Sequence, residues 1–146
     1  MLKKLLLTIC CAFLISGCSL WEKEKDEPIE LTPFEVLEKL QDAKQNSFLL
    51  YLTMDNCYSC EEYQKVIDEL ESEQPFEIYY LKIDADETDE DTKKALEELK
   101  ITTGDYYNLP MTYYFYQGSL LPENVKDGYM EKKDLKKWLE NLHILH

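Results

Sequence analysis

Two cysteines separated by two residues are the side chains of this sequence best suited to chemistry. Cys57 and Cys60 enclose Tyr58 and Ser59, where a strongly apolar stretch passes into a stretch with helical periodicity. Residues three apart lie on one face of a helix, so the two sulfur atoms can reach bonding distance with little rearrangement. The pair can therefore alternate between a dithiol and a disulfide.

The position of the pair at the start of a helix favours Cys57 as the reactive sulfur. A free thiol has a pKa of about 8.5, and the unpaired N–H groups and the dipole at a helix N-terminus stabilise its thiolate. We expect Cys57 to attack a partner disulfide and the more buried Cys60 to resolve the mixed disulfide. A structural disulfide is the weaker alternative, because so short a loop constrains the unfolded chain little.

The N-terminal segment has the pattern of an export signal. Lys3 and Lys4 precede an apolar run from Leu5 to Ile15, which falls well short of the roughly 20 residues that a spanning helix needs. The segment Ile15-Ser16-Gly17-Cys18 resembles the lipobox of bacterial lipoproteins. That resemblance implies that residues 1–17 are removed as a signal peptide and that Cys18 carries a lipid.

This N-terminus also predicts where the protein is located. Cleavage removes Cys10 and Cys11, and the lipid occupies Cys18, so only the CxxC pair stays free in a compartment where disulfides persist. We expect attachment to the extracytoplasmic face of the bacterial cell membrane through that lipid. Residues 18–31 form the predicted charged tether, and residues 32–146 form the predicted folded domain.

Composition excludes some functions and leaves others open. The chain has 146 residues, 45% of them hydrophobic, which suits one compact domain. Its formal net charge of -14 opposes contact with nucleic acid phosphates, so we expect no nucleic-acid partner. His143 and His146 are spaced more closely than the usual zinc ligands, and the sequence predicts neither a metal site nor a cofactor.

Hydrophobic periodicity predicts an α/β fold with a mixed central sheet of about four strands flanked by helices. Thr32 and Glu35 form a capping box at the start of a first helix, which runs toward Lys44. The other predicted helices begin near the cysteines and end before Pro75, follow Thr88 or Asp89, and cover Leu135 to Leu142. The predicted strands are Phe48–Leu52, Phe76–Ile83, Met111–Tyr116 and a hairpin partner, with a loop from Ile101 to Leu109.

Several of these segments together resemble the thioredoxin-like superfamily, from Thr32 to Leu142. The matching segments are Cys57-Tyr58-Ser59-Cys60, Leu81-Lys82-Ile83-Asp84, Leu109-Pro110-Met111-Thr112, Phe115-Tyr116-Gln117-Gly118 and Gly128. The resemblance implies a cis Leu109–Pro110 bond facing the cysteines, in a groove for the substrate backbone formed with Tyr58 and Ser59. It also implies a thiol-disulfide oxidoreductase that acts on exported proteins, peptides or a redox partner.

Three departures from the thioredoxin pattern leave the proton acceptor and the direction of electron flow open. Tyr51 stands where thioredoxins have a buried aspartate, and Asn56 stands where they have tryptophan. Neither residue between the cysteines is glycine or proline. The nearby Asp55, Glu61 and Glu62 oppose thiolate formation and favour a reductase or isomerase, although both glutamates also complement the helix dipole.

A second function stays open beside the enzyme. The narrower resemblance is to thioredoxin-like accessory proteins of bacteriocin export in Gram-positive bacteria, and it implies a lipid-anchored binding module without redox turnover. Tyr58, Tyr106 and Tyr107 flank the expected groove, where they either hold an extended peptide or pack within loops.

Overall fold

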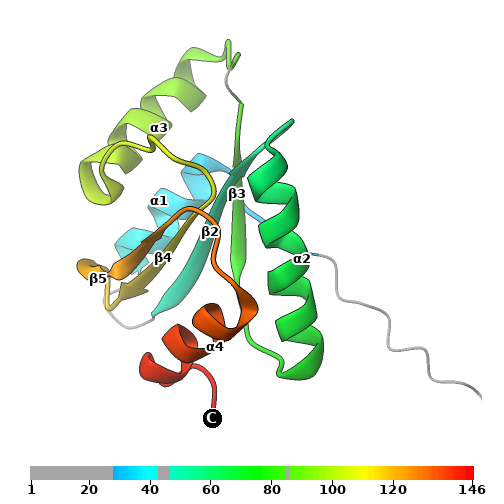
Figure 1. Ribbon diagram of the computed structural model, residues 1–146. Helices are drawn as coiled ribbons and strands as arrows, with labels where there is room; N and C mark the ends of the chain where they lie inside the picture. Colours follow the sequence, from blue (N-terminus) through cyan, green and yellow to red (C-terminus); the bar gives the residue numbers. More distant parts are fainter. Residues whose placement is uncertain (1–27, 43–46, 85) are drawn as a thin grey trace, which may run out of the picture.

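The computed structural model describes residues 28–42, 47–84 and 86–146 (Figure 1). The predicted signal peptide, the predicted lipidation site Cys18 and most of the predicted tether lie outside these residues. Within the described ranges, no helix is long and apolar enough to cross a membrane.

A mixed sheet of five strands is the framework of the fold. In spatial order β1-β3-β2-β4-β5, β1 and β2 run parallel to β3, while β4 is antiparallel to both β2 and β5. The expected α/β class and mixed sheet are therefore confirmed. The strands are β1 (Ile29–Glu30), β2 (Phe48–Met54), β3 (Tyr79–Ile83), β4 (Met111–Tyr116) and β5 (Ser119–Asp127).

The sheet has one strand more than the sequence predicted. Strand β1 pairs Ile29 with Tyr79 and Glu30 with Tyr80, although residues 18–31 were expected to be a tether. Two residues are too few to show the alternation that marks a strand in a sequence, so only the pairing with β3 reveals β1. The sheet consequently includes residues that precede Thr32.

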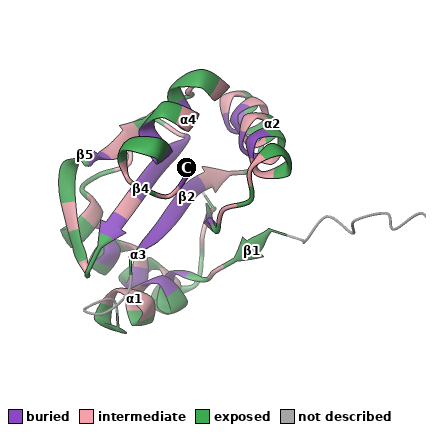
Figure 2. Ribbon diagram, turned by 90° about the horizontal axis from the view of Figure 1, so that it is seen from below, coloured by how far each residue is buried: buried purple, intermediate pink, exposed green. Residues whose placement is uncertain are grey.

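Four helices cover the two faces of this sheet. Helices α1 and α3 pack on one face, and α2 and α4 pack on the other (Figure 2). The predicted crossover from β2 through α2 to the parallel β3 is present. The helices are α1 (Pro33–Asp42), α2 (Tyr58–Glu73), α3 (Glu90–Thr103) and α4 (Lys132–Asn141).

Local capping explains where the helices begin and end. The Thr32 backbone N–H donates to Glu35 Oε2 at 2.7 Å, and the Glu35 N–H donates back to Thr32 Oγ1 at 3.3 Å, which is the predicted capping box. Asp89 caps α3 by accepting from the Thr92 N–H at 2.7 Å. Helix α3 continues through the predicted loop start at Ile101 and ends at Gly104, whose φ of 77° few other residues adopt.

The two faces of the sheet carry two separate cores. We call the core under α2 and α4 the tyrosine-side core: Leu49, Tyr51, Tyr63, Ile67, Leu70, Ile78, Tyr80, Leu135, Trp138, Leu139 and Leu145. We call the core under α1 and α3 the aliphatic-side core: Val36, Phe48, Leu50, Leu52, Leu81, Leu99, Met111, Tyr113 and Phe115. Strand β2 is buried on both faces and contributes alternate residues to each, as its continuous apolar run predicted.

Candidate active site

The two cysteines form a disulfide where β2 passes into α2. The Cys57 and Cys60 sulfurs are bonded at 2.06 Å, with their Cα atoms 5.2 Å apart. Cys57 is the N-cap residue of α2, and its Sγ accepts a hydrogen bond from the Cys60 N–H at 3.2 Å. The predicted pair on one helical face is thus present in its oxidised form, with a backbone donor directed at the outer sulfur.

The two sulfurs differ in how easily another molecule can reach them. Cys57 is 9% exposed and Cys60 is 2% exposed. Tyr58, between them, is 77% exposed and leaves the start of α2 open to solvent. Cys57 is therefore the more accessible of the two cysteines, and the order of attack and resolution stays a prediction.

The loop before β4 lies against the cysteine turn. The Leu109–Pro110 bond is cis, as the resemblance implied. The Ser59 hydroxyl donates to the Leu109 carbonyl at 3.1 Å and lies 3.4 Å from Cys57 Sγ. On the other side of the proline, the Gly128 N–H donates to the Pro110 carbonyl at 2.8 Å. The structure therefore brings Ser59 and Leu109 together beside the disulfide, with exposed Tyr58 next to Ser59.

A set of buried hydroxyl groups lies beneath the first turns of α2. Tyr51 in β2 is paired in register with Tyr80 in β3 and with Thr112 in β4, so the three side chains stand in a row on one face of the sheet. The Tyr51 hydroxyl donates to the Cys60 carbonyl at 2.9 Å. We call Tyr51, Tyr63, Tyr80 and Thr112 the hydroxyl row.

Each member of the hydroxyl row has a hydrogen-bond partner. The Thr112 hydroxyl donates to the Tyr63 hydroxyl at 3.2 Å, and the Gln64 side-chain amide donates to the Tyr80 hydroxyl at 2.9 Å. The Tyr51 ring packs edge-on against those of Tyr63 and Tyr80. Sequence reasoning singled out Tyr51 as a departure but missed the row, because the row depends on the register of three strands.

The hydroxyl row stays neutral at ordinary pH. Burial raises the pKa of Tyr51, and it raises the pKa values of Tyr63 and Tyr80 further. Among the residues that the structure describes, the buried polar side chains include no carboxylate. The buried aspartate of the thioredoxin pattern thus has no counterpart among the described residues.

The carboxylates nearest the cysteines in sequence are partly neutralised by lysines. Asp55 forms an ion pair with Lys82 of β3 at 2.8 Å, and Glu62 forms one with Lys65. The hydrogen bond that the Lys82 ammonium donates to Asp55 raises the pKa of Lys82. A hollow lined by Asp55, Glu61 and both lysines borders Cys60. The acidic surroundings predicted from the sequence therefore act on the sulfurs less strongly than three unpaired carboxylates would.

The three tyrosines predicted near the groove have different environments. Tyr106 packs against the aliphatic-side core and donates to the Leu96 carbonyl at 3.2 Å, so it has a packing role. Tyr107 is 84% exposed, like Tyr58, and both can contact another molecule. A fourth tyrosine near the site, Tyr129, was not predicted from the sequence. It follows Gly128, and the centre of its ring lies 6.0 Å from the centre of the Tyr63 ring. Its position next to the glycine that matches the thioredoxin pattern is the signal that could have indicated it.

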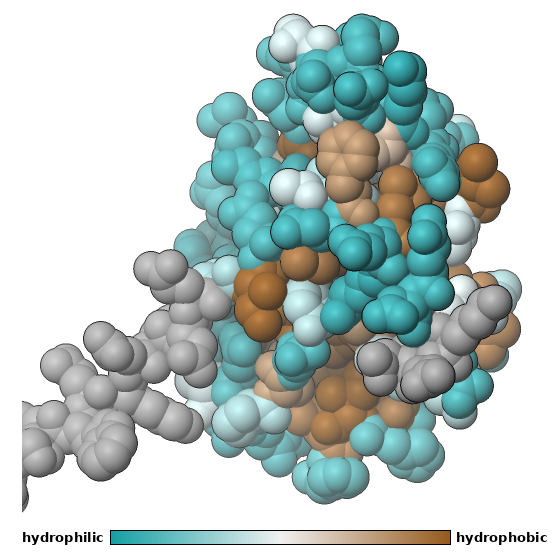
Figure 3. Space-filling view, turned by 180° about the vertical axis from the view of Figure 1, so that it is seen from behind, coloured by the Kyte–Doolittle hydropathy of each residue, from teal (hydrophilic) through white to brown (hydrophobic). Residues whose placement is uncertain are grey.

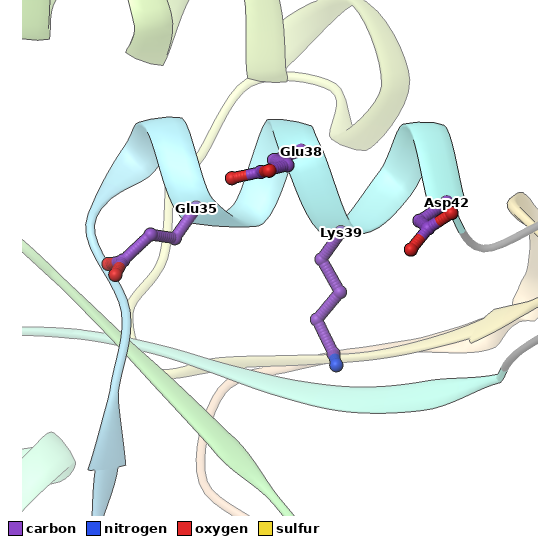
Figure 4. A pocket seen from close by; sticks show the side chains of 4 residues that line it. All are labelled: Glu35, Glu38, Lys39 and Asp42. Carbon is purple, nitrogen blue, oxygen red and sulfur yellow. The ribbon is translucent and has the colours of Figure 1, made fainter.

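The rest of the described surface has hollows but no metal-ligating cluster. The described residues contain no cluster of three or more His, Cys, Asp or Glu side chains that could hold a metal ion. A hollow along α1 is lined by Glu35, Glu38, Lys39 and Asp42 (Figure 4). Lys39 points toward the sheet, with its Nζ 4.0 Å from the centre of the Tyr79 ring, and Glu35 caps the helix. On the side opposite to the view of Figure 1, hydrophilic side chains surround scattered apolar patches (Figure 3).

The sheet order, the flanking helices and a disulfide at the start of α2 define a thioredoxin-fold protein with a CxxC pair. Thioredoxin O2 from Arabidopsis thaliana in its oxidised state is 23% identical over 78% of this chain and 92% of its own, with a TM-score of 0.53. Thioredoxin from Aeropyrum pernix is 13% identical over 77% and 84%, with a TM-score of 0.57. Thioredoxin f2 from Chlamydomonas reinhardtii is 14% identical over 80% and 95%, with a TM-score of 0.56.

These likenesses establish the thioredoxin fold. No family model matches the chain, and no curated protein matches it.

Proposed function

We propose that this protein is a thiol-disulfide oxidoreductase that acts on protein or peptide thiols and disulfides. One observation carries the proposal: a closed disulfide lies at the N-terminus of α2, with the outer sulfur of Cys57 more accessible than that of Cys60. Backbone N–H groups at a helix start stabilise a thiolate, which is the attacking form of a cysteine.

The reaction exchanges one disulfide for another. The Cys57 thiolate attacks one sulfur of the partner disulfide, which forms a mixed disulfide and releases the other partner sulfur as a thiolate. The Cys60 thiolate then attacks Cys57 Sγ, closes the Cys57–Cys60 bond and releases the second partner thiolate. The partner gains two electrons and the cysteine pair loses two, while the protons of the pair pass to the partner thiolates or to water.

The net direction that we propose is reduction or isomerisation of the partner. Strong oxidants of this chemistry owe their potential to a highly stabilised thiolate in the reduced form. Here Glu61 follows the pair directly, and the lysines nearby are engaged with Asp55 and Glu62. Equilibration of the pair with glutathione buffers tests this direction. A potential close to the roughly -120 mV of a strong periplasmic oxidant would contradict it.

Reduction of insulin by dithiothreitol tests the activity itself. The purified full chain should accelerate the reaction, and Cys57→Ser should abolish the acceleration because the attacking sulfur is gone. Cys60→Ser should instead accumulate the mixed disulfide on Cys57, which mass spectrometry detects. Circular dichroism serves as the folding control. Partner binding without acceleration by the folded wild-type chain would favour the binding module over the enzyme.

The cellular location is a second part of the proposal. The pattern Ile15-Ser16-Gly17-Cys18 after a short apolar run supports cleavage before Cys18 and attachment of a lipid to it. In a bacterial host, labelled palmitate should enter the wild-type chain but not Cys18→Ala. Protease added to intact cells that have no outer membrane should degrade the anchored domain. An unlabelled wild-type chain in the cytosol would contradict this location.

A further inference from the structure

The Ser59 hydroxyl lies between two acceptors that belong to different parts of the site. Its Oγ is 3.1 Å from the Leu109 carbonyl oxygen and 3.4 Å from Cys57 Sγ. A serine hydroxyl carries one hydrogen and donates it to one acceptor at a time. In the oxidised protein the carbonyl is the closer acceptor, and a disulfide sulfur accepts hydrogen bonds only weakly.

Reduction of the disulfide changes the relative strength of these acceptors. The Cys57 thiolate carries a full negative charge, and hydrogen bonds to an ionised acceptor are about twice as strong as neutral ones. Among the described residues, the hydrogen-bond partners of Cys57 Sγ are the Cys60 N–H at 3.2 Å and this hydroxyl. Rotation of the hydroxyl hydrogen is enough to move the bond from the carbonyl to the sulfur.

The Leu109 carbonyl is the other half of the arrangement. Leu109 precedes the cis proline Pro110, and Leu109 and Ser59 are 50 residues apart in the chain. A carbonyl that loses its donor becomes a free acceptor for a backbone N–H of another polypeptide. The reduced protein would then present both an attacking sulfur and a backbone acceptor.

We propose that Ser59 is a redox-dependent hydrogen-bond switch, which donates to the Leu109 carbonyl in the oxidised protein and to the Cys57 thiolate in the reduced protein. This inference rests on the proposed function and assigns its substrate-binding state. The reduced form, which attacks a partner disulfide, offers the Leu109 carbonyl to the backbone of that partner. The oxidised form withdraws this acceptor and favours release of the reduced partner.

Charged groups near the switch also act on the Cys57 thiolate. They are Asp55 before the helix, Glu61 and Glu62 in its first turns, Lys65 one turn further on, Lys82 from β3 and Asp127, which accepts a hydrogen bond from Asn108 next to Leu109. Substitution of Ser59 by uncharged residues leaves all of them in place. A changed titration of Cys57 therefore reports on the hydroxyl.

The first arm of the test measures the thiolate. In the reduced full chain, the rate of Cys57 alkylation by iodoacetamide is followed against pH, with mass spectrometry to identify the modified cysteine. Ser59→Ala should move the midpoint about half to one pH unit higher, roughly a three- to tenfold loss of thiolate below the midpoint. Ser59→Thr should restore the wild-type midpoint, because it keeps the hydroxyl.

A matched control is Ser72→Ala in the same helix. The Ser72 hydroxyl also donates to a backbone carbonyl, that of Glu69 at 2.7 Å, but lies more than three turns from Cys57. Its loss should leave the midpoint unchanged. An unchanged midpoint in Ser59→Ala, or an equal shift in Ser59→Thr, would overturn the proposal.

The second arm observes the carbonyl directly. The ¹³C chemical shift of the Leu109 carbonyl is recorded in the oxidised and reduced full chain, with and without Ser59→Ala. The wild-type signal should move on reduction toward its position in Ser59→Ala, and the variant signal should stay nearly constant. Equal changes in both proteins would overturn the switch. Both arms are independent of insulin turnover, so an inactive wild-type chain would count against the proposed function and leave the switch to be decided by these data.

Discussion

The two faces of the sheet are built from different chemistry. The aliphatic-side core consists mainly of hydrocarbon side chains, and its Tyr113 hydroxyl contacts the sulfur of Met111 at 3.1 Å. The tyrosine-side core contains the hydroxyl row, one member of which donates to the carbonyl of Cys60. Of the two faces, only the one with the tyrosine-side core lies under α2, the helix that carries the cysteines. The difference indicates that one face mainly supplies stability, while the other also positions the reactive turn.

Alkaline pH should have the largest effect. Three tyrosines with raised pKa values lie in the tyrosine-side core and two, Tyr106 and Tyr113, lie on the aliphatic side, so the tyrosine-side core should contribute the larger part. The pKa values of Tyr51, Tyr63 and Tyr80 are raised by burial, so the folded protein keeps protons above pH 10 that the unfolded chain loses. The stability that these protonated tyrosines give to the folded protein is fully present below pH 10 and is lost as the pH rises above it. Tyr63 and Tyr80 should each lower the free energy of unfolding by about 1.4 kcal/mol at pH 11 relative to pH 7, and Tyr51 should act in the same direction.

Urea unfolding between pH 7 and 11 measures this loss, and Tyr63→Phe isolates the contribution of one tyrosine. The variant should lose about 1.4 kcal/mol less than the wild type over the same range. Absorbance at 295 nm should show the buried tyrosines ionising only with unfolding. On the other face, burial also raises the pKa of Tyr113 and raises the pKa of Tyr106 to about 12, so Tyr63→Phe should remove only part of the pH dependence. An identical pH dependence of the free energy of unfolding in the wild type and in Tyr63→Phe would contradict this role of the buried tyrosines.

Removal of a hydrocarbon from the aliphatic-side core should have the next largest effect, on stability alone. Leu81 is completely buried in β3, so Leu81→Ala should reduce the free energy of unfolding by about 3 kcal/mol through lost contacts and a cavity. The rate of insulin reduction per folded molecule should stay at the wild-type value. A reduced rate in fully folded Leu81→Ala would show that this face also positions the site.

Removal of one hydroxyl from each face should have the smallest and most informative effect. Tyr51→Phe deletes the donor to the Cys60 carbonyl and should cost about 1 kcal/mol of stability. We expect resolution of the mixed disulfide to slow about fivefold, which is the same energy expressed as a rate. Rapid acid quenching and mass spectrometry give the lifetime of the mixed disulfide.

Tyr113→Phe is the matched control for that prediction. It removes an equally buried hydroxyl from the opposite face, where the partner is the weak acceptor Met111 Sδ. The lifetime of the mixed disulfide should not change. Equal lifetimes in Tyr51→Phe and Tyr113→Phe would mean that the hydroxyl row contributes packing only.

Features that depend on neighbouring residues could be predicted from the sequence. The capping box of Thr32 and Glu35 satisfies its own N–H groups, and the cysteines lie on one helical face because three positions span about one turn. The buried run of β2 and the strand Met111–Tyr116 follow from composition alone. Predictions of this kind hold because their physical causes act within a few residues.

The contacts between distant groups at the site could not be predicted from the sequence, because they depend on the folded arrangement of the strands. The contact of Ser59 with Leu109, the bond from Tyr51 to Cys60 and the pairing of β1 with β3 all depend on how strands align across the sheet. That alignment is set by the packing of both cores together, and no short stretch of sequence carries it. The cysteine pair itself is therefore recognisable from a few neighbouring residues, whereas the side chains and carbonyl groups that contact it are brought together only in the folded chain.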